Sequence, residues 1–358
     1  MKTVLLTGGC GFIGSHFVRL LLRLGSWNVV NLDKLTYAGN MENLKDIEKN
    51  KNYLFVKGDI CDRELLNKLF KEQEFGAVVN FAAESHVDRS IMDSEPFLRT
   101  NVIGVKRLLE ASRLNGIERF LQISTDEVYG DAEGKDPFSE TSPLCPSSPY
   151  AASKAAADLI SLAYHRTYGI PVIIARSSNN YGPYQFPEKL IPLMIRNALV
   201  GEELPVYGDG MQQRDWLYVE DNVEAILRIL DEGKIGSIYN IGTGEERTNR
   251  DVVHLLCRLL AEEVGLKLDT LALAIRSVTD RPGHDRRYAL NTKKTREELG
   301  WFHRTQFDLG LKNSILWYSK NQDWVERVTS GEYKKYYDSV YSHAWGKNPG
   351  YDKDSRNR

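Results

Sequence analysis

Thr7-Gly8-Gly9-Cys10-Gly11-Phe12-Ile13-Gly14 links a short apolar run, Thr3–Thr7, to a helical pattern over Ser15–Arg23. The apolar run is too short for a helix and is predicted to be a buried strand. Glycines at a strand-to-helix turn let the backbone approach a pyrophosphate closely, and the helix N-terminus adds free amide donors. A glycine turn alone is weak evidence. Its place after the first strand nevertheless predicts a dinucleotide-binding loop formed by Gly8, Gly11, Phe12, Ile13 and Gly14.

Outward from this turn, short apolar runs alternate with helical patterns as far as residue 180. The further predicted strands are Asn28–Leu32, Tyr53–Val56, Ala77–Phe81, Phe120–Ile123 and Val172–Ala175. The predicted helices are Ser15–Arg23, Arg63–Lys71, Val105–Asn115 and Ser153–Tyr168. This alternation predicts an α/β fold of the NAD(P)-binding Rossmann type, a doubly wound parallel sheet with helices on both faces.

The later part of the chain is less regular, because several prolines break it into loops and short helices. We expect a dinucleotide-binding domain over residues 1–178, rejoined by a segment near 212–238. A smaller, interleaved and mostly α/β lobe over residues 179–325 is expected to bind the substrate. Residues 326–358 are expected to form a C-terminal extension with a frayed end.

The composition is that of an ordinary globular protein, with 42% hydrophobic and 27% charged residues. A net charge of −2 gives no general attraction to nucleic acid or to an anionic membrane. No apolar stretch approaches the ~20 residues of a membrane span, and no export signal is visible at the start. The four cysteines are far apart and the seven histidines are scattered. We therefore expect a cytoplasmic protein with reduced thiols and no metal site.

Asp33 stands at the end of the second predicted strand. A carboxylate there accepts hydrogen bonds from the adenosine ribose and repels a 2′-phosphate, which favours NAD over NADP. The adjacent Lys34 can soften this preference, and a turn or helix-capping aspartate is the alternative. After the third and fourth strands, the expected contacts of the cofactor are Asp59 and Ile60 near the adenine, and the small residues Ala82 and Ala83.

Two tyrosines precede a lysine by four residues, but only one of these pairs is placed for chemistry. Tyr53 and Lys57 lie on a predicted strand, where four steps of ~3.3 Å hold them roughly 13 Å apart. Tyr150 and Lys154 begin a helix after Pro149, and side chains four apart on a helix are neighbours. We expect Lys154 to lower the pKa of Tyr150 and to hold the nicotinamide ribose, so that Tyr150 accepts an alcohol proton as hydride leaves. A helix-surface ion pair or a core tyrosine is the alternative.

Ser124-Thr125-Asp126-Glu127 follows directly on the predicted strand Phe120–Ile123. Ligands of open α/β sheets bind outside the carboxyl ends of the strands, so these side chains are expected to meet a substrate. Oxidation of an alcohol needs no extra carboxyl pair, whereas elimination of water uses an acid and a base. The pair therefore favours a dehydratase over a simple dehydrogenase. A solvated acidic loop or a helix cap is the alternative.

Long strings of residues carry a resemblance to known proteins over about residues 1–325. They are the glycine turn through His16, Leu32-Asp33-Lys34-Leu35-Thr36-Tyr37-Ala38-Gly39-Asn40, Phe81-Ala82-Ala83-Glu84-Ser85-His86-Val87-Asp88-Arg89-Ser90, Ser124-Thr125-Asp126-Glu127-Val128-Tyr129-Gly130, Asn179-Asn180-Tyr181-Gly182-Pro183-Tyr184, Pro187-Glu188-Lys189-Leu190-Ile191-Pro192 and Asp280-Arg281-Pro282-Gly283-His284-Asp285-Arg286-Arg287-Tyr288. By these strings the chain resembles the extended short-chain dehydrogenase/reductase superfamily and, within it, the dTDP-glucose 4,6-dehydratase family. Cys10 departs from the small Ala usual in that family and is expected to change only packing.

The resemblance implies a complete reaction. Tyr150 would deprotonate the sugar 4-hydroxyl, whose oxygen hydrogen-bonds Thr125, while NAD takes the C4 hydride. Glu127 would then remove the acidified C5 proton, and Asp126 would protonate the C6 hydroxyl as it leaves as water. Return of the hydride to C6 gives a 4-keto-6-deoxy sugar nucleotide and regenerates NAD.

The resemblance also implies the binding residues. A nucleotide diphosphate needs cations, and the candidates are Arg214, Arg281 and Lys189. Ion pairs of these arginines with their sequence neighbours are the alternatives: Asp215, Asp280 and Asp285. By position, further substrate contacts are expected from Ser85, Asn179, Leu190, Pro205, Tyr207, Asn249 and His284, and further cofactor contacts from Thr36 and Asn180. Ser85 and Asn101 either contact the sugar or position the backbone.

Other proteins with this fold leave alternatives open. A nucleotide-sugar 4-epimerase shares NAD and the Thr, Tyr and Lys, but has no need of Asp126 and Glu127. A UDP- or CDP-glucose 4,6-dehydratase differs in the nucleotide base of its substrate. Thymine and uracil differ by one methyl group, which is worth only ~1–3 kcal/mol of binding in an apolar pocket. A UDP-glucuronate decarboxylase needs a carboxylate pocket, and a non-catalytic NAD-sensing protein needs no acid pair. By resemblance we also expect a homodimer, joined by a four-helix bundle of the helices near Pro96–Asn115 and Tyr150–Tyr168.

Overall fold

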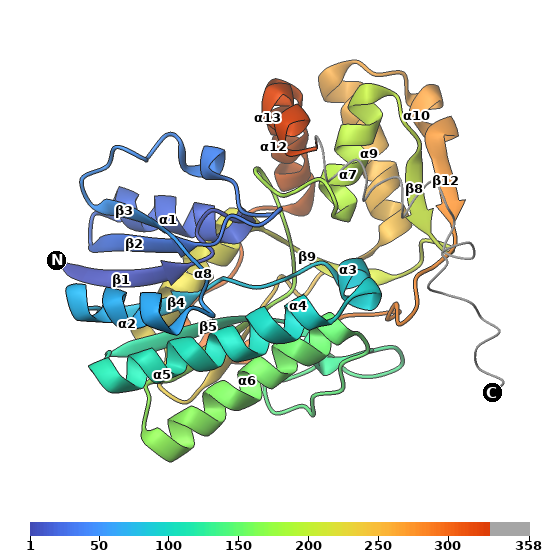
Figure 1. Ribbon diagram of the computed structural model, residues 1–358. Helices are drawn as coiled ribbons and strands as arrows, with labels where there is room; N and C mark the ends of the chain where they lie inside the picture. The colour runs from blue at the N-terminus through green and yellow to red at the C-terminus, as the bar shows by residue number, and fades with distance from the viewer. Residues whose placement is uncertain (330–358) are drawn as a thin grey trace.

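The computed structural model describes residues 1–329, and a seven-stranded sheet forms the centre of its larger lobe (Figure 1). Neighbouring strands are parallel and lie in the order β10-β6-β5-β4-β1-β2-β3. The strands are β1 Lys2–Thr7, β2 Trp27–Asp33, β3 Tyr53–Lys57, β4 Ala77–Asn80, β5 Arg119–Thr125, β6 Val172–Ser177 and β10 Ile238–Ile241. The strand order reverses between β1 and β4, and such a reversal is where α/β sheets bind their ligands.

Helices cover both faces of this sheet and bury its apolar side chains. One face packs against α1 and α8, which contribute Leu21 and Ile226 to its core, and the other against α2, α5 and α6, which contribute Leu66, Leu108 and Ala157. The helices are α1 Phe12–Leu24, α2 Arg63–Glu72, α5 Val105–Asn115, α6 Pro149–Tyr168 and α8 Val219–Glu232. The predicted parallel α/β fold is confirmed, and every strand and helix expected from the pattern forms within a few residues of its expected ends.

A smaller lobe faces the carboxyl ends of the strands and has a core of its own, which includes Met194, Leu256 and Ile315 (Figure 1). Its strands form a three-stranded sheet, β11-β9-β7, and a parallel pair, β12-β8. Its elements are β7 Asn179–Tyr181, α7 Leu190–Val200, β8 Leu204–Tyr207, β9 Gln213–Tyr218, β11 Glu246–Thr248, α9 Asn249–Val264, α10 Leu268–Ala274, β12 Ile275–Val278, α12 Phe307–Lys320 and α13 Gln322–Val328.

We propose a boundary between the two lobes near residue 178, where the sequence indicated it. The chain then crosses back, because α8 and β10 complete the larger lobe. A second return follows, in which α11 (Lys293–Leu299) and Trp301 pack on the core beside α1 and α8. The frayed end expected for the C-terminal extension, Lys347–Arg358, lies outside the described residues.

Within residues 1–329, no helix is long and apolar enough to cross a membrane. The same part of the chain holds no group of three or more His, Cys, Asp and Glu side chains arranged to bind a metal ion. All four cysteines of the chain lie in this part and are free thiols.

Candidate active site

A cavity of about 420 Å³ lies between the carboxyl ends of the strands and the smaller lobe. Every residue to which the sequence analysis assigned a role in catalysis, cofactor binding or substrate binding lines this cavity, whereas Asn101 does not. The lining also includes residues that the sequence analysis did not single out: Glu84, His86, Asp88, Gln185, Phe186, Glu188 and Trp216. Several of these belong to the strings quoted above, but a string does not show which of its members face a cavity.

The glycine turn is shaped for close approach of a ligand. Gly8 has a φ of +74°, and a Cβ there would lie 2.6 Å from the backbone nitrogen of Ala82. A Cβ on Gly14 would lie 2.3 Å from the carbonyl oxygen of Gly8. Gly11 caps α1 without a side-chain hydrogen bond, so the amides of the first turn are left for a ligand. The turn therefore fits a dinucleotide pyrophosphate.

Replacing Gly8 with Ala is expected to destabilise the fold and to abolish retention of a dinucleotide. The new methyl group would collide with the backbone of the loop that follows β4. Gly116→Ala is the matched control, since Gly116 has a φ of +65° but nothing within 4 Å of a Cβ. Its cost is the left-handed backbone alone, ~1–2 kcal/mol. Thermal melting and the nicotinamide content after gel filtration compare the two. Equal retention by both variants would contradict the close-approach role of Gly8.

Asp33 ends β2 with its carboxylate at the cavity wall. Its Oδ2 accepts the N–H of Cys10 and its Oδ1 that of Leu35, both at 2.8 Å. The turn-aspartate alternative is therefore partly right, although each oxygen keeps a lone pair for a ribose hydroxyl. Lys34 forms an ion pair with Asp59 at 2.9 Å, which offsets the charge that was expected to soften the NAD preference.

The helix α6 begins as its sequence indicates. Ser148 caps the helix by accepting the N–H of Ala151 at 3.1 Å, and Pro149 is the first helical residue. Tyr150 and Lys154 are both buried and both line the cavity. The Nζ of Lys154 donates to the carbonyl of Ile123 at 2.6 Å, which ties α6 to the end of β5.

Burial reverses the expected pKa shift of Tyr150. Removal from water raises the pKa of Tyr150, and the carboxyl groups of Glu127 and Asp126 raise it further. Burial also lowers the pKa of Lys154 to about 8, although Asp158 opposes this shift. The expectation that Lys154 lowers the tyrosine pKa was wrong, because an i,i+4 spacing shows that two groups are neighbours but omits the cost of desolvating them.

Thr125, Asp126 and Glu127 pass from the end of β5 into the short helical turn η3 (Asp126–Tyr129). The Oγ1 of Thr125 accepts the N–H of Glu127 at 3.3 Å and donates to Oδ1 of Asp126 at 3.1 Å. The Oδ2 of Asp126 and the Oε2 of Glu127 are buried and have no hydrogen-bond partner within residues 1–329. These contacts exclude a solvated acidic loop, while the cap alternative is correct for Thr125.

The two carboxyl groups have unusual proton affinities. Burial and the neighbouring Glu127 raise the pKa of Asp126 to about 8. Burial also raises the pKa of Glu127, although the cations Arg281 and Lys189 oppose the shift. The raised pKa favours the protonated form of Asp126, which is the form that a general acid needs.

Arg214 lines the cavity without the ion pair that its sequence neighbour suggested. Its Nη2 donates to the carbonyl of Asp285 at 2.8 Å, and its guanidinium lies 4.1 Å from the ring centre of Tyr288. Asp215 instead accepts the N–H and the hydroxyl of Thr243 at 3.0 and 2.7 Å. Arg214 is thus held by backbone and ring contacts that leave its charge for a ligand.

Arg281 also avoids the partners suggested by the sequence. Its Nη1 lies 3.3 Å from Oδ1 of Asp88, on α3 (Val87–Met92). Asp280 takes a different partner, because its Oδ1 lies 2.6 Å from Nδ1 of His284. The third candidate cation, Lys189, donates its Nζ to the carbonyl of Ser85 at 2.8 Å.

The remaining amide side chains divide into two groups. Asn101 holds the backbone of Glu84, accepting its N–H at 2.9 Å and donating to its carbonyl at 3.0 Å. The backbone-positioning alternative therefore holds for Asn101. Other amide groups have a buried Oδ1 with no hydrogen-bond partner in the described part of the chain, and so suit a ligand: Asn179, Asn180 and Asn249.

The fold and the cavity define a Rossmann-type, dinucleotide-dependent enzyme with two carboxyl groups beside a tyrosine and a lysine. Residues 5–314 match the model of the GDP-mannose 4,6 dehydratase family, and the chain belongs to this family.

Individual relatives agree with this assignment. The chain is 50% identical over 347 residues to a dTDP-glucose 4,6-dehydratase of Neisseria meningitidis, covering 93% of this chain and 98% of the relative. A Bacillus anthracis dTDP-glucose 4,6-dehydratase, solved in complex with NAD, is similar with a TM-score of 0.84 at 46% identity, covering 92% of this chain and 100% of that one. A Thermotoga maritima UDP-glucose 4-epimerase, solved with UDP-glucose, gives a TM-score of 0.82 at 31% identity, covering 90% and 100%.

Proposed function

We propose that the chain catalyses the dTDP-glucose 4,6-dehydratase reaction, which converts dTDP-glucose to dTDP-4-keto-6-deoxyglucose and water with bound NAD. The observation that carries the proposal is the buried carboxyl pair Asp126 and Glu127 beside Tyr150 in a cavity that fits a dinucleotide. The relative from Neisseria meningitidis, at 50% identity over nearly the whole chain, supports the same reaction. The product is a precursor for deoxysugar biosynthesis.

When bound, NAD supplies the acceptor for the C4 hydride and the donor for C6. The glycine turn and the N-terminus of α1 would hold its pyrophosphate, Asp33 its adenosine ribose and Lys154 its nicotinamide ribose. The other residues proposed to contact it line the same cavity: Lys34, Thr36, Asp59, Ile60, Ala82, Ala83 and Asn180.

The protons are moved by side chains of this chain. Tyr150 would take the proton of the sugar 4-hydroxyl on its Oη as the tyrosinate, a form that the positive charge of a bound nicotinamide would favour against the burial that raises its pKa. Thr125 hydrogen-bonds the same sugar oxygen. The C4 ketone acidifies the C5–H bond, and Glu127 removes that proton. Asp126 gives its proton to the C6 hydroxyl, so that the C6–O bond breaks and water leaves. Glu127 then returns a proton to C5 when C6 is reduced.

The nucleotide part of the substrate is proposed to lie against the smaller lobe. Three cations, Arg214, Arg281 and Lys189, would bind the diphosphate. The other proposed contacts are the lining residues Ser85, Asn179, Leu190, Pro205, Tyr207, Asn249 and His284.

A 4-epimerase is the nearest rival, since a UDP-glucose 4-epimerase shares the fold at 31% identity. The reaction of an epimerase leaves Asp126, whose pKa burial raises, without a task. A side-by-side assay of dTDP-, UDP- and CDP-glucose tests the proposal. We expect a 4-keto-6-deoxy product chiefly from dTDP-glucose, with deuterium placed at C4 of the substrate recovered at C6. A 4-epimer as the product, or loss of the deuterium, would contradict it.

The rate of elimination is expected to fall as the pH rises through about 8, the pKa to which burial and Glu127 raise Asp126. The sign follows because a general acid works only while protonated, and a raised pKa keeps it protonated below that pH. The rate of product formation at saturating substrate, measured as a function of pH, tests this decrease. The Asp126→Asn variant should react slowly, and its rate should not change with pH over the same pH range. If the rate of this variant still falls as the pH rises, the decrease reports the titration of another group, such as Lys154.

We also propose that two copies of the chain associate through a four-helix bundle of α5 and α6 with their counterparts. Exposed apolar side chains on and before these helices support the proposal, among them Leu98, Ile103, Leu114 and Leu159. Burial of such side chains between two copies is favourable by roughly 25 cal/mol per Å² of apolar surface. Sedimentation at micromolar concentration is expected to give a dimer, and a monomer would contradict the proposal.

A cytoplasmic location is part of the same proposal. Its support is that the four cysteines are free thiols, as is usual in a reducing compartment.

A further inference from the structure

An ionised carboxylate lies among the cations of the proposed diphosphate site. Asp88 is buried on α3 and lines the cavity. Burial alone would raise the pKa of Asp88, but the neighbouring His86 and Arg281 and the hydroxyl of Tyr207 hold it below its ordinary value. A negative charge in this place repels a diphosphate. Asp88 would therefore oppose binding of a diphosphate in the ground state, unless its contacts improve the placement of the reacting groups.

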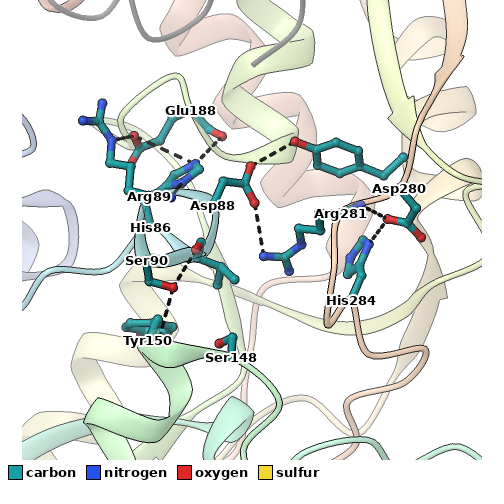
Figure 2. A network of polar contacts seen from close by, with 12 residues as sticks. His86, Asp88, Arg89, Ser90, Ser148, Tyr150, Glu188, Asp280, Arg281 and His284 are labelled. Atoms are coloured by element: carbon teal, nitrogen blue, oxygen red, sulfur yellow. Dashed lines mark hydrogen bonds and ion pairs between the residues drawn. The ribbon is translucent and has the colours of Figure 1, made fainter. Parts of the chain in front are cut away.

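Asp88 joins two residues of the smaller lobe to the larger one. Its Oδ1 lies 3.3 Å from Nη1 of Arg281 (Figure 2). Its Oδ2 accepts the hydroxyl of Tyr207 at 2.9 Å. Tyr207 and Val278 are paired at the ends of β8 and β12, and Arg281 follows Val278 closely in the chain. The Asp88 carboxylate thus holds both the end of the sheet β8-β12 and the guanidinium of Arg281, which follows that sheet in the chain.

The same short helix also holds the tyrosine at the other end of the site. The Oγ of Ser90, two residues after Asp88, accepts the N–H of Tyr150 at 3.1 Å (Figure 2). The same Oγ donates to the carbonyl of Val87 at 2.6 Å. The segment of α3 from Asp88 to Ser90 therefore links Arg281, proposed to bind the diphosphate, to Tyr150, proposed to contact the sugar. The Ser90–Tyr150 contact is buried, and the Asp88–Arg281 contact is partly buried.

The distance between these two points must match the substrate. In a nucleotide sugar the diphosphate is bonded to the anomeric carbon, so the distance from phosphorus to the C4 oxygen is set by the hexose ring. A misplacement of about 1 Å at a reacting atom can cost about 10²-fold in rate. We propose that Asp88 is a positioning residue: by fixing Arg281 and Tyr207 relative to Tyr150, it places the 4-hydroxyl of the bound sugar against the tyrosine oxygen. The inference rests on the proposed function and goes beyond it, because Asp88 acts through Arg281.

Asp88→Asn tests the role, since it keeps the size of the side chain but removes the charge. We expect kcat for dTDP-glucose to fall about 10²-fold, because the sugar is misplaced. The Kd for dTDP alone is expected to stay the same or to become lower, because a repelling charge has gone. Asp93→Asn is the matched control: Asp93 is exposed at the end of the same helix, and its variant should leave both values unchanged.

A purely structural role for Asp88 would raise the Kd for dTDP by the same factor by which kcat/KM falls, and this result would overturn the proposal. An unchanged kcat would also overturn it. If Asp88→Asn does not fold, Tyr207→Phe removes one hydrogen bond of the carboxylate without changing any charge. It keeps the aromatic ring, the part of Tyr207 proposed to contact the substrate, because the hydroxyl is donated to Asp88. That variant should lower kcat about 10-fold with no rise in the Kd for dTDP, and parallel losses would again overturn the proposal. Turnover by the wild-type protein in the same assay distinguishes failure of this proposal from failure of the proposed function. If the wild-type protein makes no 4-keto product, the proposed function itself is wrong.

Discussion

Asp126→Asn and Glu127→Gln are expected to stop the reaction between oxidation and the loss of water. Each variant keeps the size of the side chain but removes the proton transfer that it performs. General acid or base catalysis contributes about 10²–10⁴-fold, so turnover of dTDP-glucose should fall by about that factor. Tyr150 and Lys154 are untouched, so C4 is still oxidised. Reduced nicotinamide should therefore accumulate on mixing with substrate, and its absorbance measures the arrest.

Hydrogen exchange at C5 separates the two variants. In deuterated water, Asp126→Asn retains the base and should exchange the C5 proton while the C6–O bond stays intact. Glu127→Gln lacks the base and should show no exchange. Glu133→Gln, an exposed carboxylate shortly after this turn, is the control and should turn over normally. Full turnover by either active-site variant, or exchange in Glu127→Gln alone, would refute the assignment of acid to Asp126 and base to Glu127.

The larger lobe could be predicted well because its signals are local. Runs such as Val4–Leu6 are fully buried on both faces of a parallel sheet, so they are continuously apolar and easily found. The glycine turn and the proline at the start of α6 likewise act within a few residues. The smaller lobe was predicted as a mostly α/β region, but its individual strands were not, because they are three to six residues long and pair with distant partners. The pairing of β8 with β12, for example, joins segments about 70 residues apart.

The candidate site could be predicted as a set of residues but not as a set of contacts. The resemblance to the family predicted that Arg214, Arg281 and Lys189 share one cavity, and all three line it. Their partners could not be predicted, because the aspartate that pairs with Arg281 is Asp88, 193 positions away, rather than a neighbour. The direction of the Tyr150 pKa shift was missed for a related reason. It depends on burial and on two carboxyl groups brought close by the fold, neither of which an i,i+4 spacing contains.

Tyr150→Phe is expected to suppress even the first oxidation, by about 10²–10⁴-fold, because no other side chain is assigned to the proton of the 4-hydroxyl. The fold should persist, since the variant keeps the ring that packs edge-on against Phe97 and the N–H that Ser90 accepts. Mixing with dTDP-glucose should then produce no rapid absorbance of reduced nicotinamide. Tyr168→Phe, an exposed tyrosine at the end of the same helix, is the control.

The order of the steps gives this prediction a second, stricter form. If Tyr150 acts before the carboxyl pair, the double variant Tyr150→Phe with Glu127→Gln should behave like Tyr150→Phe alone and accumulate no reduced nicotinamide. If the double variant accumulated it as Glu127→Gln does, oxidation would be proceeding without the tyrosine hydroxyl. The proton of the 4-hydroxyl would then be leaving by another route, and the buried Lys154, whose pKa burial lowers to about 8, would be the first group to test.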